Sequence, residues 1–379
     1  MNTNKVITML INVLYVLSIF CSSIWSCSPP PSCWPPCGPC SSCVWGQCSF
    51  GCGTGMICTN GGCVPANITF VYDSVGNRIS MTDTSGTTSY SYDYLGRLTS
   101  VTNPNNKTIS YQYDASGNRT QMTDPSNNIT TYSYDDDNRL EEVETSAGST
   151  IYQYDSFGRQ TRVDYPNGTY TEYTYHPQRH WLTSVTNKDS SDATLSSYTY
   201  TYDDVGNRLT VTEADSSLVT YQYDDIYQLT SEARTGTNAY SITYQYDDVG
   251  NRTQMIKNAA TTTYTYNNDN QLTAELTNGV TTAYNYDNNG NLTSKAVGGS
   301  TTTYAWDWRN MLVSVTESAG TTVYQYDGAG NRANKTVSGV KTKYINDVGH
   351  GLTQVLMETD NVGVVQASYS YGNDLISMY

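Results

Sequence analysis

Charged residues are scarce in this chain of 379 residues, and basic residues are the scarcest of them. Asp, Glu, Lys and Arg make up 15% of the sequence, against about 25% in an average soluble domain. The sequence has 20 Lys and Arg against 35 Asp and Glu, which gives a formal charge of −15. Binding to nucleic acid or to anionic lipid heads needs a basic surface. We therefore expect no nucleic-acid partner.

Cysteine is absent after Cys63. The first residues of the chain indicate its cellular location. Lys5 precedes a largely apolar run over residues 6–20 and then small residues, which is the pattern of a signal peptide. We place that peptide at residues 1–26. An uncleaved anchor is the alternative, although the run is shorter than the about 20 residues of a spanning helix. The pattern predicts a secreted or cell-surface protein.

Residues 27–65 form a Cys-, Pro- and Gly-rich segment with almost no aliphatic core. Ile24 to Cys27 resembles a bacterial lipoprotein cleavage box, so Cys27 is the lipidation candidate. Exported thiols are oxidised, and we expect four disulfides among the other eight Cys, with their pairing left open. These disulfide candidates are Cys33, Cys37, Cys40, Cys43, Cys48, Cys52, Cys58 and Cys63.

A metal centre is the rival interpretation of the same Cys segment. Cys37 to Cys43 read C-x2-C-x2-C, the start of an iron–sulfur ligand run. The fourth ligand of such a run belongs at Gln47, and no His lies nearby to complete a zinc site. Disulfides are therefore favoured, and we expect neither metal nor cofactor.

A Tyr-Asp dipeptide recurs from residue 66 onward at intervals of mostly 20 or 21 residues, and we assign residues 66–340 to these repeats. Thirteen phased repeat units do not arise by chance. One gap, from Tyr175 to Tyr202, is 27 residues and predicts an insertion of about one hairpin loop. The repeats begin at Tyr72, Tyr92, Tyr113, Tyr134, Tyr154, Tyr175, Tyr202, Tyr223, Tyr246, Tyr266, Tyr286, Trp306 and Tyr326.

Each repeat has the pattern of a β-hairpin. Aromatic residues alternate with polar ones, as at Tyr90 and Tyr92, so that both rings lie on one face of a strand. Stacked repeats should align these rings into ladders. Gly or Asn follows four residues after the first aromatic in 11 repeats, which predicts a tight turn with positive φ. Arg179 and Tyr227 break this rule, and we expect irregular turns there.

The recurring Asp after the Tyr predicts a structural role for that carboxylate. It stands in 11 of the 13 repeats, where it can accept hydrogen bonds from turn amides. No helical periodicity of useful length follows residue 24. The expected fold is therefore all-β, a curled antiparallel sheet of about 13 hairpins, because wide open sheets twist out of plane.

Tyr-Asp-x-x-Gly-Asn-Arg, as in Tyr72 to Arg78 and Tyr246 to Arg252, resembles the YD repeat of Rhs and teneurin proteins. The resemblance covers residues 66 to about 379. It implies a spiral β-sheet that forms a hollow shell, which in that family encloses a C-terminal toxin or belongs to an adhesion receptor. It also implies a structural, non-enzymatic function.

Residues 341–379 resemble the start of the region that precedes the core of the Rhs family. The resemblance rests on Asn346 to Leu356 and on Tyr369 to Ser377. The core, its self-cleavage site and the toxin are not found before Tyr379. We therefore expect an incomplete shell that self-associates or needs a partner chain, since free sheet edges recruit other chains.

Chemistry other than shell formation finds little support in the sequence. His176, His180 and His350 lack ligand spacing and read as exposed loop residues. The Asp pairs, such as Asp203-Asp204, recur identically, as turn capping predicts and as a glycosidase does not. Weak calcium binding at the turns and a hydrolase remain lesser alternatives. The main alternative is a surface adhesion or carbohydrate-binding module, because rings can stack on sugars.

Overall fold

The computed structural model describes residues 41–44, 47–50, 56–59, 62–65, 68–349 and 351–378, and these form strands and turns without a helix. Within these residues, no helix is both long and apolar enough to cross a membrane. The expected signal peptide at 1–26 lies outside them. The expected fold class, an all-β antiparallel sheet of repeated hairpins, is confirmed.

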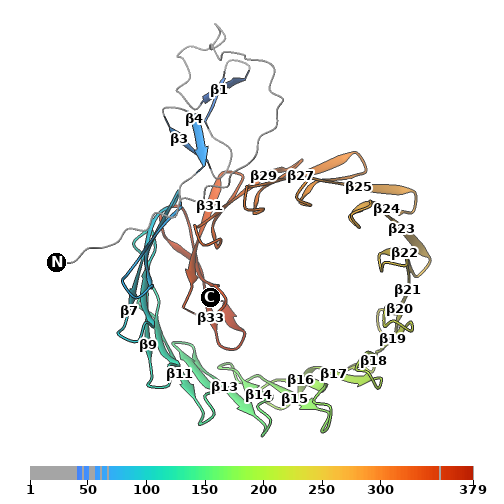
Figure 1. Ribbon diagram of the computed structural model, residues 1–379. Coiled ribbons are helices and arrows are strands. Elements are labelled where there is room, and N and C mark those ends of the chain that lie inside the picture. Colours follow the sequence, from blue (N-terminus) through green and yellow to red (C-terminus); the bar gives the residue numbers. More distant parts are fainter. Residues whose placement is uncertain are drawn as a thin grey trace, which may run out of the picture. The chain divides into compact units, whose positions relative to one another are not determined.

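Strands β5 to β34 form the repeat sheet, and each pairs with the next in sequence (Figure 1). The pairing is antiparallel throughout. The first fifteen strands of the sheet are β5 (Thr69–Tyr72), β6 (Arg78–Asp83), β7 (Gly86–Tyr92), β8 (Leu98–Thr102), β9 (Thr108–Tyr113), β10 (Arg119–Thr123), β11 (Ile129–Tyr134), β12 (Leu140–Thr145), β13 (Gly148–Tyr154), β14 (Gln160–Asp164), β15 (Tyr170–Tyr175), β16 (Leu182–Lys188), β17 (Thr194–Tyr202), β18 (Arg208–Glu213) and β19 (Leu218–Tyr223). The remaining strands are β20 (Leu229–Thr235), β21 (Tyr240–Tyr246), β22 (Arg252–Lys257), β23 (Ala260–Tyr266), β24 (Leu272–Thr277), β25 (Val280–Tyr286), β26 (Leu292–Val297), β27 (Ser300–Trp306), β28 (Leu312–Glu317), β29 (Gly320–Tyr326), β30 (Arg332–Val337), β31 (Val340–Asp347), β32 (Gln354–Thr359), β33 (Val365–Tyr371) and β34 (Leu375–Met378).

Two short hairpins precede the repeat sheet. Strands β1 (Ser41–Val44) and β2 (Gln47–Phe50) form the first, and β3 (Met56–Thr59) and β4 (Gly62–Pro65) the second. The backbone register places Cys43 opposite Cys48 in one and Cys58 opposite Cys63 in the other.

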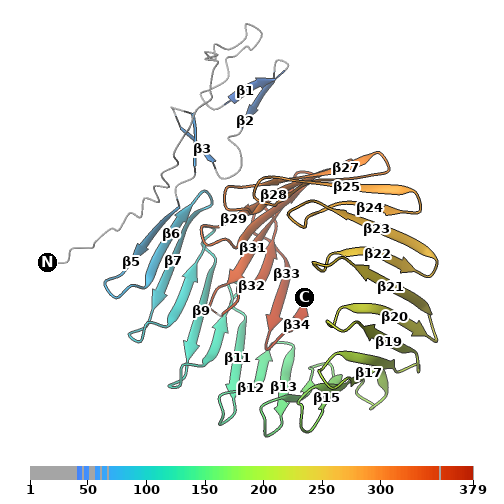
Figure 2. The same cartoon turned by 45° about the vertical axis from the view of Figure 1, so that its right-hand side comes forward.

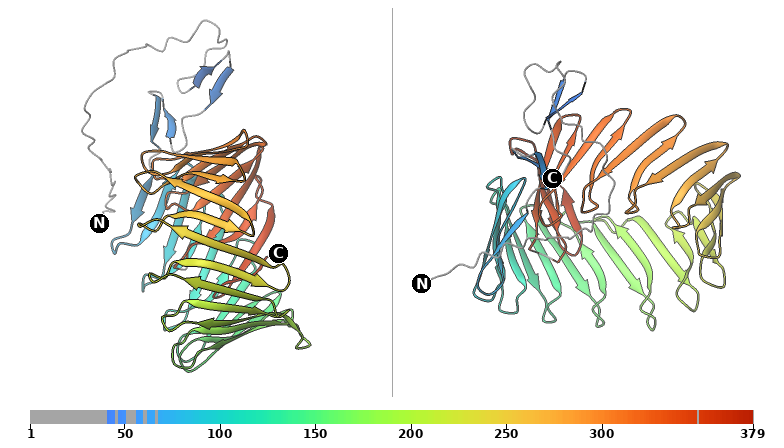
Figure 3. Two further views of the ribbon diagram at one scale, coloured as in Figure 1. Left: turned by 90° about the vertical axis from the view of Figure 1, so that its right-hand side faces the viewer. Right: turned by 45° about the horizontal axis from the view of Figure 1, so that its top comes forward.

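The chain divides into two compact units. Unit 1 comprises residues 1–111, 305–314 and 321–368, and unit 2 comprises residues 112–304, 315–320 and 369–379. Within unit 2, β10 to β26 follow one another side by side (Figure 2). The hairpin turns of these strands alternate between the two margins of the sheet (Figure 3).

The turn after each Tyr-Asp has one geometry, illustrated by residues 92–98. The Asp93 N–H donates to the Arg97 carbonyl at 3.0 Å, and the Gly96 N–H donates to the Asp93 carbonyl at 3.0 Å. The register slips at Tyr92, which pairs with Leu98. This is a three-residue hairpin loop with a G1 bulge, and it needs one residue with positive φ.

The predicted Gly and Asn positions are confirmed as the residues with positive φ. The φ values lie between 58° and 101° at Gly76, Gly96, Gly117, Gly158, Gly206, Gly250, Gly290, Gly330, Asn138, Asn270 and Asn310.

One of the two irregular turns that the sequence predicted is in fact regular. Tyr227 adopts the left-handed conformation, with φ of 67°, in the standard turn. The Asp224 carboxylate accepts from the Ile226 and Gln228 amides and holds that conformation. The left-handed region costs a non-glycine residue about 1–2 kcal/mol, which this capping offsets.

The turn around Arg179 is irregular, as expected, but its left-handed residue is His180. The turn is one residue longer than the others, because the His176 N–H donates to the Trp181 carbonyl at 2.7 Å. His180 has φ of 60°. The expected extra hairpin loop is not present; instead β17, with nine residues, is longer than the other described strands.

The expected aromatic ladder is interrupted by the second strand of each hairpin. Tyr90 lies opposite Val101, and Tyr152 lies opposite Val163. Rings of successive repeats are therefore two strands apart, about 9.6 Å, and not one. The Val side chains between them are 5% and 3% exposed, so the buried layer is mixed aromatic and aliphatic.

Replacing Gly206 by Val should destabilise the protein much more than replacing Asp204 by Asn. Gly206 has φ of +101°, and a Cβ there would lie 3.1 Å from Trp181 Cζ2, so we expect a loss of about 1–3 kcal/mol. The Asp204 side chain is 100% exposed and pairs only with Arg179 at 3.0 Å, so its loss should stay within about 0.5 kcal/mol. Urea unfolding of both variants measures the difference. Equal losses would contradict the turn geometry.

Candidate functional site

The Asp of each Tyr-Asp pair caps its own turn, as the sequence predicted. Asp247 Oδ1 accepts from the Val249 and Asn251 amides at 3.1 and 2.8 Å, and Oδ2 accepts from Asn251 Nδ2 at 3.0 Å. The bond to the amide four residues later recurs in every repeat that has this Asp. These residues are Asp73, Asp93, Asp114, Asp135, Asp155, Asp203, Asp224, Asp247, Asp287, Asp307 and Asp327.

Hydrogen bonds lower the pKa of two of these carboxyls, Asp155 and Asp287, below the ordinary value. The Arg159 side chain is the largest influence on Asp155 and lowers the pKa of its carboxyl. At Asp287, the Asn291 side chain has the same effect. Most of the repeated carboxylates are therefore already occupied as turn caps, which explains why identical Asp residues recur along the chain.

The Tyr before the Asp joins its repeat to the preceding one. The Tyr266 hydroxyl donates to the Arg252 carbonyl at 2.9 Å, and Arg252 is the first residue of β22. A Phe could not donate this bond, which explains why Tyr and not Phe stands at this position of the repeat. The same bond, at 2.6–3.0 Å, is made by Tyr92, Tyr134, Tyr154, Tyr175, Tyr202, Tyr223, Tyr246, Tyr286 and Tyr326.

The Arg of the Gly-Asn-Arg motif lies between aromatic rings. The Arg252 guanidinium carbon is 5.7 Å from the Tyr244 ring centroid and 4.4 Å from that of Tyr264. Arg78 lies in the same way between Phe70 and Tyr90, at 5.6 and 4.5 Å. Such cation–π contacts fill the gap between rings two strands apart. The recurring Arg was the available sequence signal for this contact, and our sequence analysis missed it.

In unit 1, the segment that follows β31 covers the aromatic face of the N-terminal strands. The Tyr111 hydroxyl donates to Asp347 Oδ1 at 2.7 Å, and both residues are buried, 4% and 2% exposed. Gly349 lies against the Tyr111 ring, where an added Cβ would be 2.8 Å from Cζ. This segment is part of the tail whose resemblance to the Rhs family was noted above.

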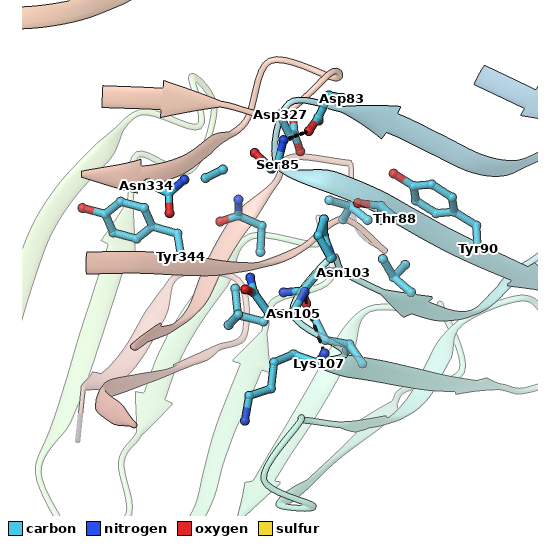
Figure 4. A pocket seen from close by; sticks show the side chains of 17 residues that line it. Asp83, Ser85, Thr88, Tyr90, Asn103, Asn105, Lys107, Asp327, Asn334 and Tyr344 are labelled. Atoms are coloured by element: carbon cyan, nitrogen blue, oxygen red, sulfur yellow. Dashed lines mark hydrogen bonds between the residues drawn. The ribbon is translucent and has the colours of Figure 1, made fainter. Parts of the chain in front are cut away.

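A small polar pocket lies beside this contact (Figure 4). Its volume is about 80 Å³, enough for a few water molecules. Asp83 and Asn103 line it from the N-terminal strands, and Asn334 and Tyr344 from β30 and β31. Asp83 Oδ2 accepts from the Gly328 amide at 2.7 Å. The pocket lies between strands that are distant in sequence. Both of its carboxylates accept hydrogen bonds, Asp83 from the Gly328 amide and Asp327 from the Asn331 amide.

In unit 2, the last described residues lie on the aromatic face of β13 and β14. Asn373 Nδ2 donates to the Tyr154 hydroxyl at 3.0 Å and to Gln160 Oε1 at 3.2 Å. Burial raises the pKa of Tyr152 well above its ordinary value. The aromatic face is thus covered by polypeptide in this part of unit 2.

The histidines take part in the irregular turn. His176 Nδ1 accepts from the Gln178 and Arg179 amides at 3.2 and 3.1 Å, so it replaces the capping Asp. His180 lies against the Phe157 ring, with centroids 4.8 Å apart, and its Nδ1 is 2.9 Å from Arg159 Nη1. His180 is exposed, as the sequence predicted, whereas His176 is half-buried, and His350 lies outside the described residues.

The predicted disulfide and lipidation sites fall largely outside the described residues. Cys27, Cys33, Cys37, Cys40 and Cys52 lie outside them. Cys43, Cys48, Cys58 and Cys63 are described by their backbone alone, in the registers given above. Their pairing and lipidation stay predictions.

Comparison with known protein families agrees with the repeats found in the sequence. The family described as RHS Repeat matches five overlapping stretches, residues 72–108, 92–129, 113–151, 134–170 and 154–192. No curated protein matches the chain.

Solved structures share the fold at low sequence identity. The crystal structure of TcdB2-TccC3-TEV is 17% identical, with a TM-score of 0.54, over 82% of this chain and 22% of that one. The crystal structure of TcdB2-TccC3-Cdc42 is 18% identical, with a TM-score of 0.53 and the same coverage. This chain thus spans about a fifth of the length of those structures.

Replacing Tyr266 by Phe should weaken the sheet although the ring is kept. The change leaves the Arg252 carbonyl without its donor, which should cost about 1 kcal/mol of unfolding free energy. Tyr94→Phe is the matched control, because Tyr94 is 92% exposed. Urea unfolding of both variants tests this. A Tyr266→Phe protein as stable as the control would show that the hydroxyl bond contributes nothing.

Proposed function

The chain is an RHS-repeat protein, and on that premise we propose that it is a structural, non-enzymatic protein that forms part of a shell around, or a scaffold for, another polypeptide. The observation that carries this proposal is that the repeated polar groups make contacts within the protein itself. The Asp carboxylates cap turns, the Tyr hydroxyls bind the preceding repeat, and the Arg side chains separate rings. A catalytic site needs convergent groups that are available to a substrate.

A partner chain is the second part of the proposal. The proteins of similar fold are nearly four times longer, since 82% of this chain covers 22% of them. In this proposal, a partner polypeptide supplies further wall or the contents of the shell. The aromatic face of unit 2 suits such a partner, because Tyr221, Tyr244 and Tyr284 are only half-buried. Burial of such rings is a major source of interface energy.

Export fits the same proposal. We infer that residues 1–26 direct secretion and that residues 27–65 are crosslinked by disulfides and lie at the cell surface or outside it. The opposed backbone positions of Cys43 and Cys48, and of Cys58 and Cys63, support pairing within each hairpin. Lipidation at Cys27 would attach the protein to a membrane.

Surface adhesion or carbohydrate binding is the second candidate function. The half-buried Tyr rings of unit 2 favour it, because a ring exposed on one side can stack on a pyranose. A glycan array probed with the purified chain distinguishes this candidate. Glycan binding that Tyr244→Ser abolishes would favour adhesion over the shell.

Co-expression with the product of the adjacent reading frame tests the shell proposal. We expect a complex that protects the partner from protease. Tyr244→Ser should weaken co-purification, whereas Gln245→Ser should not, because neighbouring strand residues point to opposite faces. The melting temperatures of both variants establish that they fold. A partner digested equally fast with and without this chain would refute the shell.

A further inference from the structure

Three consecutive turns at one margin of unit 2 expose the same pair of side chains, a carboxylate followed by a branched apolar residue. The turns connect β17 to β18, β19 to β20 and β21 to β22 (Figure 2). We call this set of residues the apolar rim. It consists of Asp204, Val205, Asp225, Ile226, Asp248 and Val249.

The three apolar residues occupy the same position in turns of the same geometry. Their amides donate to the capping Asp Oδ1 at 3.0 Å for Val205, 3.0 Å for Ile226 and 3.1 Å for Val249. Turns with the same bonds hold this residue in the same way relative to their own strands. Since adjacent turns of the rim are two strands apart, the side chains recur about every 9.6 Å.

The fold does not require apolar residues at these positions. Val205, Ile226 and Val249 are 59%, 71% and 71% exposed. In other repeats, Ser116 and Asp137 occupy the equivalent position and are exposed as well. A row of exposed apolar side chains that packing does not explain is typical of an interaction surface.

The carboxylates of the apolar rim determine which charge a partner must carry. Asp225 and Asp248 are exposed and form no ion pair with a described cation, and Asp204 faces Arg179. A partner therefore needs basic groups beside its apolar ones. A second copy does not fit, because two such rims would bring carboxylates together. The opposite margin of these strands carries polar turns, such as Asp215 to Ser217 and Gly236 to Asn238. Its nearby basic side chains are engaged, because Arg234 pairs with Glu213 and the Lys257 Nζ lies 6.0 Å from the Tyr240 ring centroid.

The spacing of the rim points to an extended partner segment. A polyproline-II helix repeats every three residues, or about 9.3 Å, close to the spacing of the rim. We propose that the apolar rim binds a polyproline-II segment of a partner protein that carries one apolar and one basic residue in each triplet. Such a segment is ordered before binding and loses little conformational entropy. The proposal goes beyond the shell function, because the rim is at the margin of the sheet and not on its aromatic face.

A fluorescein-labelled peptide, (Leu-Arg-Pro)4, serves as the probe for the full chain in fluorescence anisotropy. We expect saturable binding that Val205→Ser, Ile226→Ser and Val249→Ser together weaken at least tenfold. Asp204→Asn, Asp225→Asn and Asp248→Asn together should weaken binding at low salt and flatten its salt dependence, because exposed charges are screened. The matched control is Val280→Ser, Val297→Ser and Val340→Ser, at exposed apolar residues outside the rim.

Several outcomes would overturn the proposal. They are no binding of the probe, equal binding of (Leu-Glu-Pro)4 or of a scrambled peptide, and rim variants that bind like the wild type. Equal weakening by the control substitutions would also overturn it. Melting temperatures of all variants establish that they fold. Tyr244→Ser should leave probe binding unchanged, so failure of the shell proposal and failure of this one are separable.

Discussion

The fold of this protein depends on a hairpin turn in which a carboxylate fixes one residue in the left-handed conformation. The Asp accepts the amides two and four residues later, and the backbone then forms a bulge at the preceding Tyr. The bulge sets the register of the two strands, and a shift of one residue would turn every side chain to the other face. The position of the Tyr hydroxyl against the preceding repeat follows from this register.

Small, repeated contributions replace a large apolar core. A hydrogen bond such as that from Tyr266 to the Arg252 carbonyl contributes about 1 kcal/mol net, but ten repeats have one. Repeat proteins gain stability as such a sum of neighbouring interfaces. This explains how a chain with 15% charged residues and few aliphatic residues can form a long sheet. Because stability comes from the repeated contacts, the exposed positions of the turns are free to vary in sequence. The apolar rim lies at such positions.

Local features were predictable from the sequence, and non-local ones were not. Positive φ at Gly206 and capping by Asp203 follow from residue chemistry within one turn. Tyr227 was mispredicted because capping by Asp224 outweighs the intrinsic preference of the residue. The bond from Tyr111 to Asp347 spans 236 residues and has no signature in either segment. Residue Arg252 between two rings was missed because its partners come from different strands.

The most direct test of the capped turn is the melting temperature as a function of pH, at a salt concentration that screens exposed ion pairs. The hydrogen bonds at Asp155 and Asp287 lower the pKa of those carboxyls below the ordinary 3.8. A lowered pKa in the folded state contributes stability above the ordinary pKa, and that stability is lost as the pH falls through the lowered value. The account predicts a constant melting temperature from about pH 7 to 5 and a steep cooperative fall below about pH 4. A melting temperature that stays unchanged down to about pH 2 would show that the carboxylates do not hold the turns.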